Sequence, residues 1–132
     1  MRVMLDTNIC IHIIRRRPRA VLERFGAFAV GDIGVSAITL AELEYGASNS
    51  RDPKRNRDAL QRFAAPLEVA AFDRAATEAY GRIRTVLERG GRLIGPMDLL
   101  IAAHALSLDV GLVTSNEDEF KRVPGLVVEN WL

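Results

Sequence analysis

Short apolar runs alternate with helical patterns along the whole chain, and this alternation limits the possible folds more than any other feature. The expected strands lie at residues 2–5, 32–35, 67–72, 112–114 and 126–128. Between them, apolar residues recur at helical spacing at residues 9–16, 19–28, 37–47, 55–64, 74–89 and 97–107. Strands that alternate with helices favour a parallel sheet with helices packed on it. We therefore predict an α/β fold with a central, mostly parallel sheet of four to five strands.

The length of 132 residues predicts a single domain over residues 1–132. A content of 48% apolar and 27% charged residues is typical of a globular chain in water. A single cysteine, Cys10, excludes an internal disulfide framework and a zinc site built from several cysteines. No apolar run reaches about 18 residues, and the N-terminus lacks the pattern of a signal peptide, so we expect a cytoplasmic protein without a membrane partner.

The basic residues are mostly arginines, which gather in three stretches of the chain. Lysine occurs only at Lys54 and Lys121, whereas arginines cluster within residues 15–19, 51–57 and 82–92. The guanidinium group matches the geometry of phosphate. The net charge is only +1, so charge alone fits either solvated helix faces or a local nucleic-acid surface.

Three acidic residues stand where a solvated carboxylate is not expected. Asp6 directly follows the first strand, and Asp98 opens the apolar helix that begins after Gly95-Pro96. Glu42 shares its predicted helix face with Ile38, Ala41 and Tyr45, whereas Glu44 falls on another side. A capping role would explain Asp6 or Asp98 alone, and a place at the edge of the apolar stripe would explain Glu42. For the helix at residues 9–16, we expect Thr7 or Asn8 to be the capping residue.

A polar and acidic segment, residues 115–120, follows the expected fourth strand. Ligands of parallel sheets bind beyond the carboxyl ends of the strands, so we expect these acids to meet at one sheet edge. Carboxylates without cysteine or histidine partners suit a hard cation, Mg²⁺ or else Mn²⁺. Such an ion can activate water and neutralise charge while a phosphodiester bond breaks.

Other chemistries find little support. The glycines match neither of the two common phosphate-binding loops. Cys10 and His104 lie in apolar surroundings, and we expect a core cysteine and a packed histidine with satisfied hydrogen bonds. Phosphatases that start with an aspartate after the first strand carry a second one two residues later, where this chain has Asn8.

Four blocks of sequence together resemble the PIN-domain ribonuclease toxins of type II toxin–antitoxin systems, the VapC family. The blocks are MLDTN at the N-terminus, TLAELEYGA in the first third, GPMDLLIAAHA near residue 100, and LVTSNEDEF followed by RVPGLVVENW. They occur in the order and spacing of the family and span nearly the whole chain. The resemblance implies a PIN-like three-layer α/β/α fold and a Mg²⁺-dependent endoribonuclease that cleaves RNA, with structured RNA such as tRNA as the family expectation.

The resemblance also assigns roles by position. Asp6, Glu42 and Asp98 correspond to the first three acids of the family, and Asp6 with Asp98 forms its usual Mg²⁺ pair. Asn116 stands among the catalytic positions where many PIN domains have an aspartate. Which of the neighbouring acids turns inward, and whether one metal or two bind, stays open; these acids are Glu117, Asp118 and Glu119. The hydroxyls of Thr7 and Thr114 match positions that orient a carboxylate or a metal-bound water.

Family members form homodimers and are neutralised by a VapB antitoxin, which contacts the groove and active site of the toxin and binds operator DNA itself. The resemblance thus implies an RNA substrate, a homodimer, a heteromeric complex with an antitoxin, and operator DNA only through that antitoxin. Residues 9–28 and 48–63 are the expected antitoxin contacts. Two other hypotheses stay open: a binding module of the same fold without catalysis, and a different hydrolase, either a Mg²⁺ phosphatase or a DNA flap nuclease.

Overall fold

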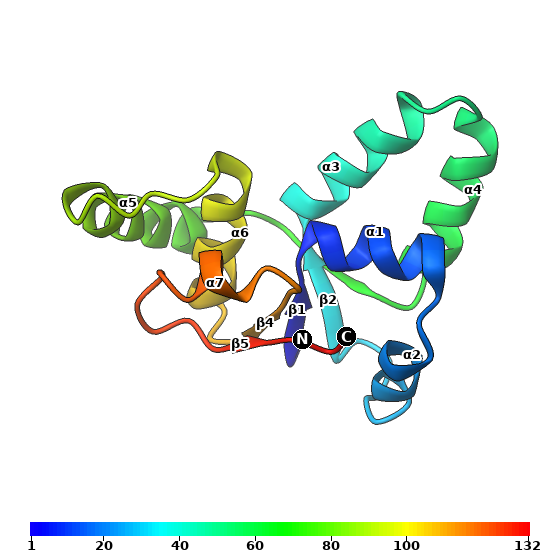
Figure 1. Cartoon of the computed structure of the whole chain (residues 1–132), viewed down its shortest axis with the longest axis horizontal. Coiled ribbons are helices and arrows are strands. Elements are labelled where there is room, and N and C mark those ends of the chain that lie inside the picture. Colours follow the sequence, from blue (N-terminus) through cyan, green and yellow to red (C-terminus); the bar gives the residue numbers. More distant parts are fainter.

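Five parallel strands form one sheet in the order β3-β2-β1-β4-β5, in a computed structural model that describes residues 1–132 (Figure 1). The strands are β1 (Val3–Leu5), β2 (Ile33–Ser36), β3 (Glu68–Ala70), β4 (Gly111–Val113) and β5 (Val128–Glu129). The helices are α1 (Thr7–Arg16), α2 (Arg19–Phe25), α3 (Ala37–Ser48), α4 (Pro53–Ala64), α5 (Arg74–Arg89), α6 (Pro96–Ser107) and α7 (Glu117–Phe120). The predicted α/β class with a parallel sheet is confirmed.

The sheet separates two hydrophobic cores, because successive residues of a strand point to opposite faces. On β1, Met4 is buried in a core with residues of α5 and α6, whereas Leu5 is buried in a second core with residues of α1 and α2. Figure 1 shows α5, α6 and α7 on one side of the sheet and α1 to α4 on the other. The arrangement has three layers, as predicted.

Strand β1 lies at the centre of the sheet and pairs with both β2 and β4. Leu5 is in register with Val35 and with Val113, so the residues that follow these three strands meet at one edge. Each of the three strands is followed directly or after a short turn by a helix: α1, α3 and α7. This edge is where the sequence places its polar residues.

Two local predictions for the helices are wrong. The side chain of Asp6, and not that of Thr7 or Asn8, caps α1 by accepting the Ile9 N–H at 2.8 Å. On α3 the buried residues are Thr39, Leu43 and Ala47, while Tyr45 is 69% exposed. The reason is that α3 packs on α1 and α4 through the 39–43–47 stripe, which leaves Glu42 at the border of that stripe.

Cys10 is buried in the second core, as predicted, and burial raises the pKa of its thiol well above the usual value. His104 is also buried, and its Nδ1 lies 2.7 Å from the Ser36 hydroxyl oxygen. The prediction that this histidine is fully satisfied is wrong for one atom, because Nε2 has no hydrogen-bond partner. Burial lowers the pKa of the His104 ring, which keeps it neutral in this apolar setting.

No helix in the structure combines the length and the apolar character that crossing a membrane requires.

Candidate active site

Asp6 and Thr114 form the base of the site, because they follow the paired ends of β1 and β4. The Asp6 N–H donates to the Val113 carbonyl at 3.0 Å, which continues the strand pairing by one residue. The Thr114 hydroxyl donates to Asp6 Oδ2, while Oδ1 of the same carboxylate accepts the Ile9 N–H. Asp6 is 1% exposed and Thr114 is fully buried. Both oxygens of Asp6 are therefore held in fixed directions.

Glu42 reaches the same edge from α3. The Thr7 hydroxyl donates to Glu42 Oε1 at 2.6 Å and lies 3.1 Å from the Thr39 hydroxyl. Ser36, the last residue of β2, begins α3 by accepting the Ile38 N–H at 3.0 Å. The cap fixes the start of the helix, so Glu42 is brought to the sheet edge near the first turn of α1.

Asp98 lies in the first turn of α6, after the break at Gly95-Pro96. The N-cap residue of that helix is Gly95, and no side chain makes a capping hydrogen bond, so Asp98 does not cap α6 as Asp6 caps α1. Asp98 is half-buried and faces Glu119, Asp6 and Glu42, whose negative charges all act on its carboxyl group. The structure thus brings together the three acids that the sequence singled out.

Glu119 is the acid of the 115–120 segment that turns inward. Its Oε1 accepts the Gly95 N–H at 2.8 Å, and its Oε2 accepts from the amide of Asn116. Asp118 is exposed, and Glu117 contacts Asn130 at 3.4 Å. The fully buried ring of Phe120 anchors the short helix α7 and so fixes which neighbour faces the site. Sequence patterns over four residues could not settle this choice.

Asn116 holds the groups around it through both its backbone and its side chain. Its N–H donates to the Thr114 hydroxyl at 2.9 Å, and that hydroxyl in turn donates to Asp6. Its side-chain amide donates to Glu119. The residue that stands in place of an aspartate therefore links two carboxylates of the site, and Glu119 supplies a fourth acid nearby.

Burial and nearby negative charge make two of these groups, Asp98 and Asp6, hard to ionise. Burial, followed by repulsion from Glu119 and a hydrogen bond with it, raises the pKa of Asp98 to about 7. Burial also raises the pKa of Asp6, although the hydrogen bonds from Thr114 and the Ile9 N–H act in the opposite direction. The pKa values are raised because negative charge is unfavourable in a site with little water. A bound cation would lower them again.

The protein itself provides no such cation. The ion pairs of the chain involve the N-terminus with Glu68, Arg2 with Asp32, and Arg84 with Glu88, none of them at this edge. Nor do three or more Asp, Glu, His or Cys side chains close around one point as a complete metal cage. Mg²⁺ needs no such cage, since it keeps several waters and uses one or two carboxylates. The donor set of carboxylate oxygens fits this kind of ion.

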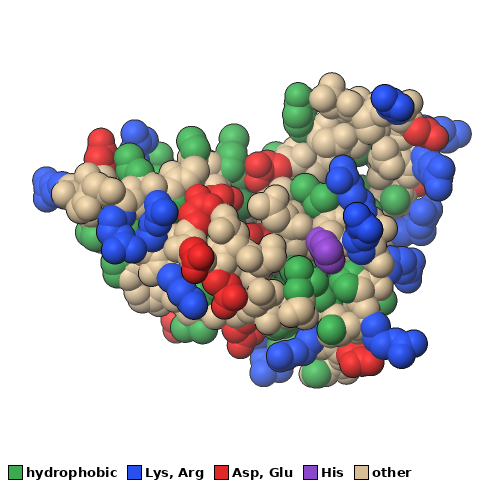
Figure 2. Space-filling model, viewed as in Figure 1, with side chains coloured by type: hydrophobic (Ala, Val, Ile, Leu, Met, Phe, Trp, Pro, Cys, Tyr) green, Lys and Arg blue, Asp and Glu red, His purple; other side chains and the backbone are tan.

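Basic side chains flank the acidic middle of one face of the molecule. Figure 2 shows acidic groups gathered where α6 and α7 lie, with Lys and Arg along the side formed by α1, α2 and α4 and also at the opposite end, over α5. Exposed arginines there include Arg15, Arg16 and Arg17 of α1 and its end, and Arg55 and Arg57 of α4. A polyanion bound across this face would meet positive charge beside the acidic centre.

A family model described as PIN domain matches residues 3–126 of the chain. Ribonuclease VapC2 of Rickettsia felis is 44% identical over 132 residues, which cover 99% of this chain and 98% of that protein. The tRNA(fMet)-specific endonuclease VapC of Shigella flexneri is 44% identical over 131 residues, with coverage of 99% and 98%.

Solved structures agree with the sequence relatives. The crystal structure of VapBC2 from Rickettsia felis, bound to a DNA fragment from the promoter, contains a chain that superposes with a TM-score of 0.95 at 43% identity, covering 100% of both chains. DNA-bound VapBC from Salmonella typhimurium gives a TM-score of 0.96 at 42% identity and covers 100% of this chain and 99% of that one.

Proposed function

The chain belongs to the PIN-domain family and to its VapC ribonucleases, and from this premise we propose that it is the toxic endoribonuclease of a toxin–antitoxin pair. One observation carries the proposal. Four carboxylates, one directly after β1 and one each from α3, α6 and α7, lie together at one sheet edge, and no cationic side chain pairs with them. A site that keeps unpaired, half-buried negative charge is suited to a divalent cation and a phosphate.

PIN-domain nucleases depend on metal in general, and we assign Mg²⁺, with Mn²⁺ as a substitute, to this chain. Asp6 and Asp98 are the residues that would hold it, since they come from the centre of the sheet and from the rigid start of α6. When bound, the cation activates water and neutralises the charge that develops on the scissile phosphate.

The chain's own residues then orient the reacting groups. Glu42, held by the Thr7 hydroxyl, directs the attacking water through one carboxylate oxygen. Thr114 fixes the direction of the Asp6 carboxylate, and Asn116 connects Thr114 with Glu119. We assign Asn116 as a positioning residue of the predicted catalytic set, because its polar groups are engaged by protein neighbours.

Initiator tRNA is the substrate we propose. Two relatives that cover 99% of the chain, from Shigella flexneri and Salmonella typhimurium, are named tRNA(fMet)-specific endonucleases at 44% and 42% identity. The arginines of α1 and α4 would hold the RNA backbone through salt-dependent contacts. Aromatic residues make up only 6% of the chain, so recognition by RNA shape fits better than extensive base stacking.

An antitoxin of the VapB type is the protein partner we propose, together with a homodimeric toxin in the cytoplasm. The solved VapBC structures from Rickettsia felis and Salmonella typhimurium are bound to DNA, and for this chain we assign DNA contact to the antitoxin. Expression of this chain alone should arrest bacterial growth, and co-expression of the antitoxin encoded beside it should restore growth.

The decisive test of the activity uses purified protein and defined RNAs. Transcripts of initiator tRNA and of an elongator tRNA are incubated with Mg²⁺, with EDTA, or with the Asp98→Asn variant. We expect a single cut in initiator tRNA with Mg²⁺ and a loss of about 10³-fold or more for EDTA or the variant, because charge stabilisation by a metal is worth several kcal/mol. Equal cutting by wild type and Asp98→Asn would contradict the assignment of the site.

A further inference from the structure

A groove of about 170 Å³ leads away from Glu42 between α1, α3 and α4. Its walls include apolar side chains of all three helices, such as Leu43 and Leu60, and its polar members are Arg15, Glu42, Ser50 and Asn56. Since Glu42 belongs to both, the groove is continuous with the acidic site.

A helical glycine lies in the wall of this groove without a reason in the fold. Gly46 is in the interior of α3, its φ is not positive, and a Cβ added to it would meet no atom within 4 Å. Glycine in such a place makes a helix less stable than alanine does. What sets Gly46 apart from other helical glycines is its place beside Glu42, where the open space lets a ligand come close to the backbone.

The polar members of the groove suit a nucleotide. Arg15 is exposed and makes no ion pair with any carboxylate of the chain, so its guanidinium is free to bind phosphate. The Asn56 side chain is exposed and makes no hydrogen bond within the protein, so it offers both a donor and an acceptor to a base edge. The apolar walls suit the faces of an unstacked base.

We propose that this groove is the subsite for one unpaired nucleotide of the RNA next to the cleaved phosphate, and that Gly46 keeps it open. The base lies between α3 and α4, and its outer phosphate contacts Arg15. The subsite rests on the proposed ribonuclease function, since its inner end is Glu42. A subsite of this kind requires that the substrate has an unpaired nucleotide next to the cleaved phosphate.

The test fills the groove and measures cleavage of the initiator tRNA transcript by the full chain without any partner protein. Gly46→Leu should raise KM about tenfold or more and change kcat by less than about threefold, because a subsite contact adds to binding of substrate and transition state alike. Gly46→Ala should raise KM by a smaller factor while raising the melting temperature. Arg15→Gln should raise KM and reduce the slope of log binding constant against log salt concentration by about one.

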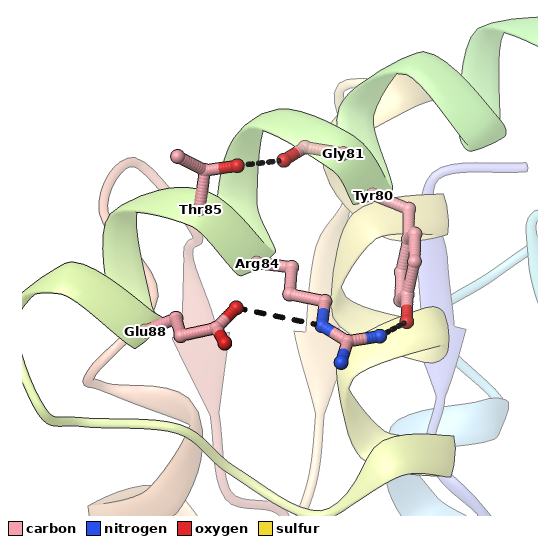
Figure 3. Close-up of polar contacts among 5 residues, drawn as sticks. All are labelled: Tyr80, Gly81, Arg84, Thr85 and Glu88. Carbon is pink, nitrogen blue, oxygen red and sulfur yellow. Dashed lines mark hydrogen bonds and ion pairs between the residues drawn. The ribbon is translucent and has the colours of Figure 1, made fainter.

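Gly81 offers a matched control on α5. It is also a helical glycine whose added Cβ would meet nothing within 4 Å, and its carbonyl accepts from Thr85 (Figure 3). Gly81→Ala should raise the melting temperature as Gly46→Ala does, with KM and kcat unchanged. Because Gly46→Ala favours the helix, the comparison stands even where Gly46→Leu fails to fold.

The outcomes separate the subsite from the activity. A wild-type protein that cuts no RNA contradicts the proposed function itself. A wild type that cuts, with Gly46→Leu and Gly46→Ala at unchanged KM, overturns the subsite alone. Normal cleavage by Gly46→Leu together with escape from inhibition by the antitoxin would show that a protein segment occupies the groove, and would also overturn it.

Discussion

The charged groups at the sheet edge and those along α5 show how differently one chain can treat charge. On α5, the exposed Arg84 donates to the hydroxyl of the half-buried Tyr80 at 2.8 Å and pairs with the exposed Glu88 at 3.7 Å (Figure 3). At the sheet edge, Asp6, Asp98 and Glu119 are buried or half-buried and face one another without a cation. The charges on α5 have partners within the protein. The buried carboxylates at the sheet edge have none, and they lower the stability of the fold until a cation binds.

The comparison shows which property distinguishes functional charged groups from the other charged groups. Acidic side chains occur in both regions, so the presence of an acid does not distinguish them. The acids at the sheet edge differ because they are buried without a cationic partner in the protein. Such a group does not stabilise the fold, so its presence indicates a functional role. The predictions below test this difference with matched substitutions in the two regions.

Glu119→Gln against Glu88→Gln gives the largest expected effect. Glu119→Gln keeps the size of the side chain but removes one negative charge from the site, so we expect tRNA cleavage to fall about 100-fold, at the upper end for groups that orient metal ligands. Glu88→Gln on α5 should leave the rate unchanged. Equal rates for both variants would place Glu119 outside the site.

Thr114→Val against Thr85→Val should have an intermediate effect. Thr114→Val removes the hydroxyl that orients Asp6, so we expect Mg²⁺ affinity, measured by calorimetry, to fall about tenfold. Thr85 donates only to the Gly81 carbonyl on the surface of α5, and its replacement should not alter metal binding. A Thr114→Val protein with wild-type affinity would contradict the positioning role.

The pH dependence of stability follows from the raised pKa of Asp98. In the unfolded chain this group ionises near 3.8, and in the folded chain near 7, so the folded state binds the proton more tightly. Folding stability of the metal-free protein should therefore fall as pH rises from about 4 to 7.

Asp98→Asn should remove much of that loss. Without metal at pH 8 we expect this variant to melt several degrees above wild type, since 1 kcal/mol corresponds to about 4 °C for a domain of this size. Saturating Mg²⁺ should stabilise wild type and not the variant. A metal-free melting temperature independent of pH between 4 and 8 would argue against the repulsion described for the site.

Arg84→Ala should have the smallest effect. Arg84 and Glu88 are both exposed, and exposed ion pairs contribute little to stability in water. We expect cleavage, metal binding and melting temperature all to match wild type within error. A clear loss of activity would show that α5 takes part in the function.

Sequence alone predicted the parallel sheet because the strands and helices each carry a strong hydrophobic period. It also placed Asp6 and Asp98 correctly, since a residue after a buried strand or at the start of an apolar helix has few possible positions. The cap of α1 was assigned to the wrong residue because Asp6, Thr7 and Asn8 all favour that role, and only the backbone angles decide between them.

The sequence could not predict the orientation of side chains that depends on tertiary packing. Glu117, Asp118 and Glu119 are chemically alike, and Glu119 faces the site only because Phe120 fills the core behind α7. Tyr45 was expected on the same inward face as Glu42, but α3 packs on α1 and α4 and leaves that ring exposed. Helical spacing defines which residues share a face and not how the helix rolls against its neighbours.

A crystal of the protein soaked in Mn²⁺ most directly tests whether carboxylates from separate parts of the chain cooperate to hold a divalent ion. Anomalous scattering should give a peak in contact with Asp6 and Asp98, and the Asp98→Asn crystal should lose it. A wild-type map without a peak at this position, or with one only among surface acids elsewhere, would contradict the account.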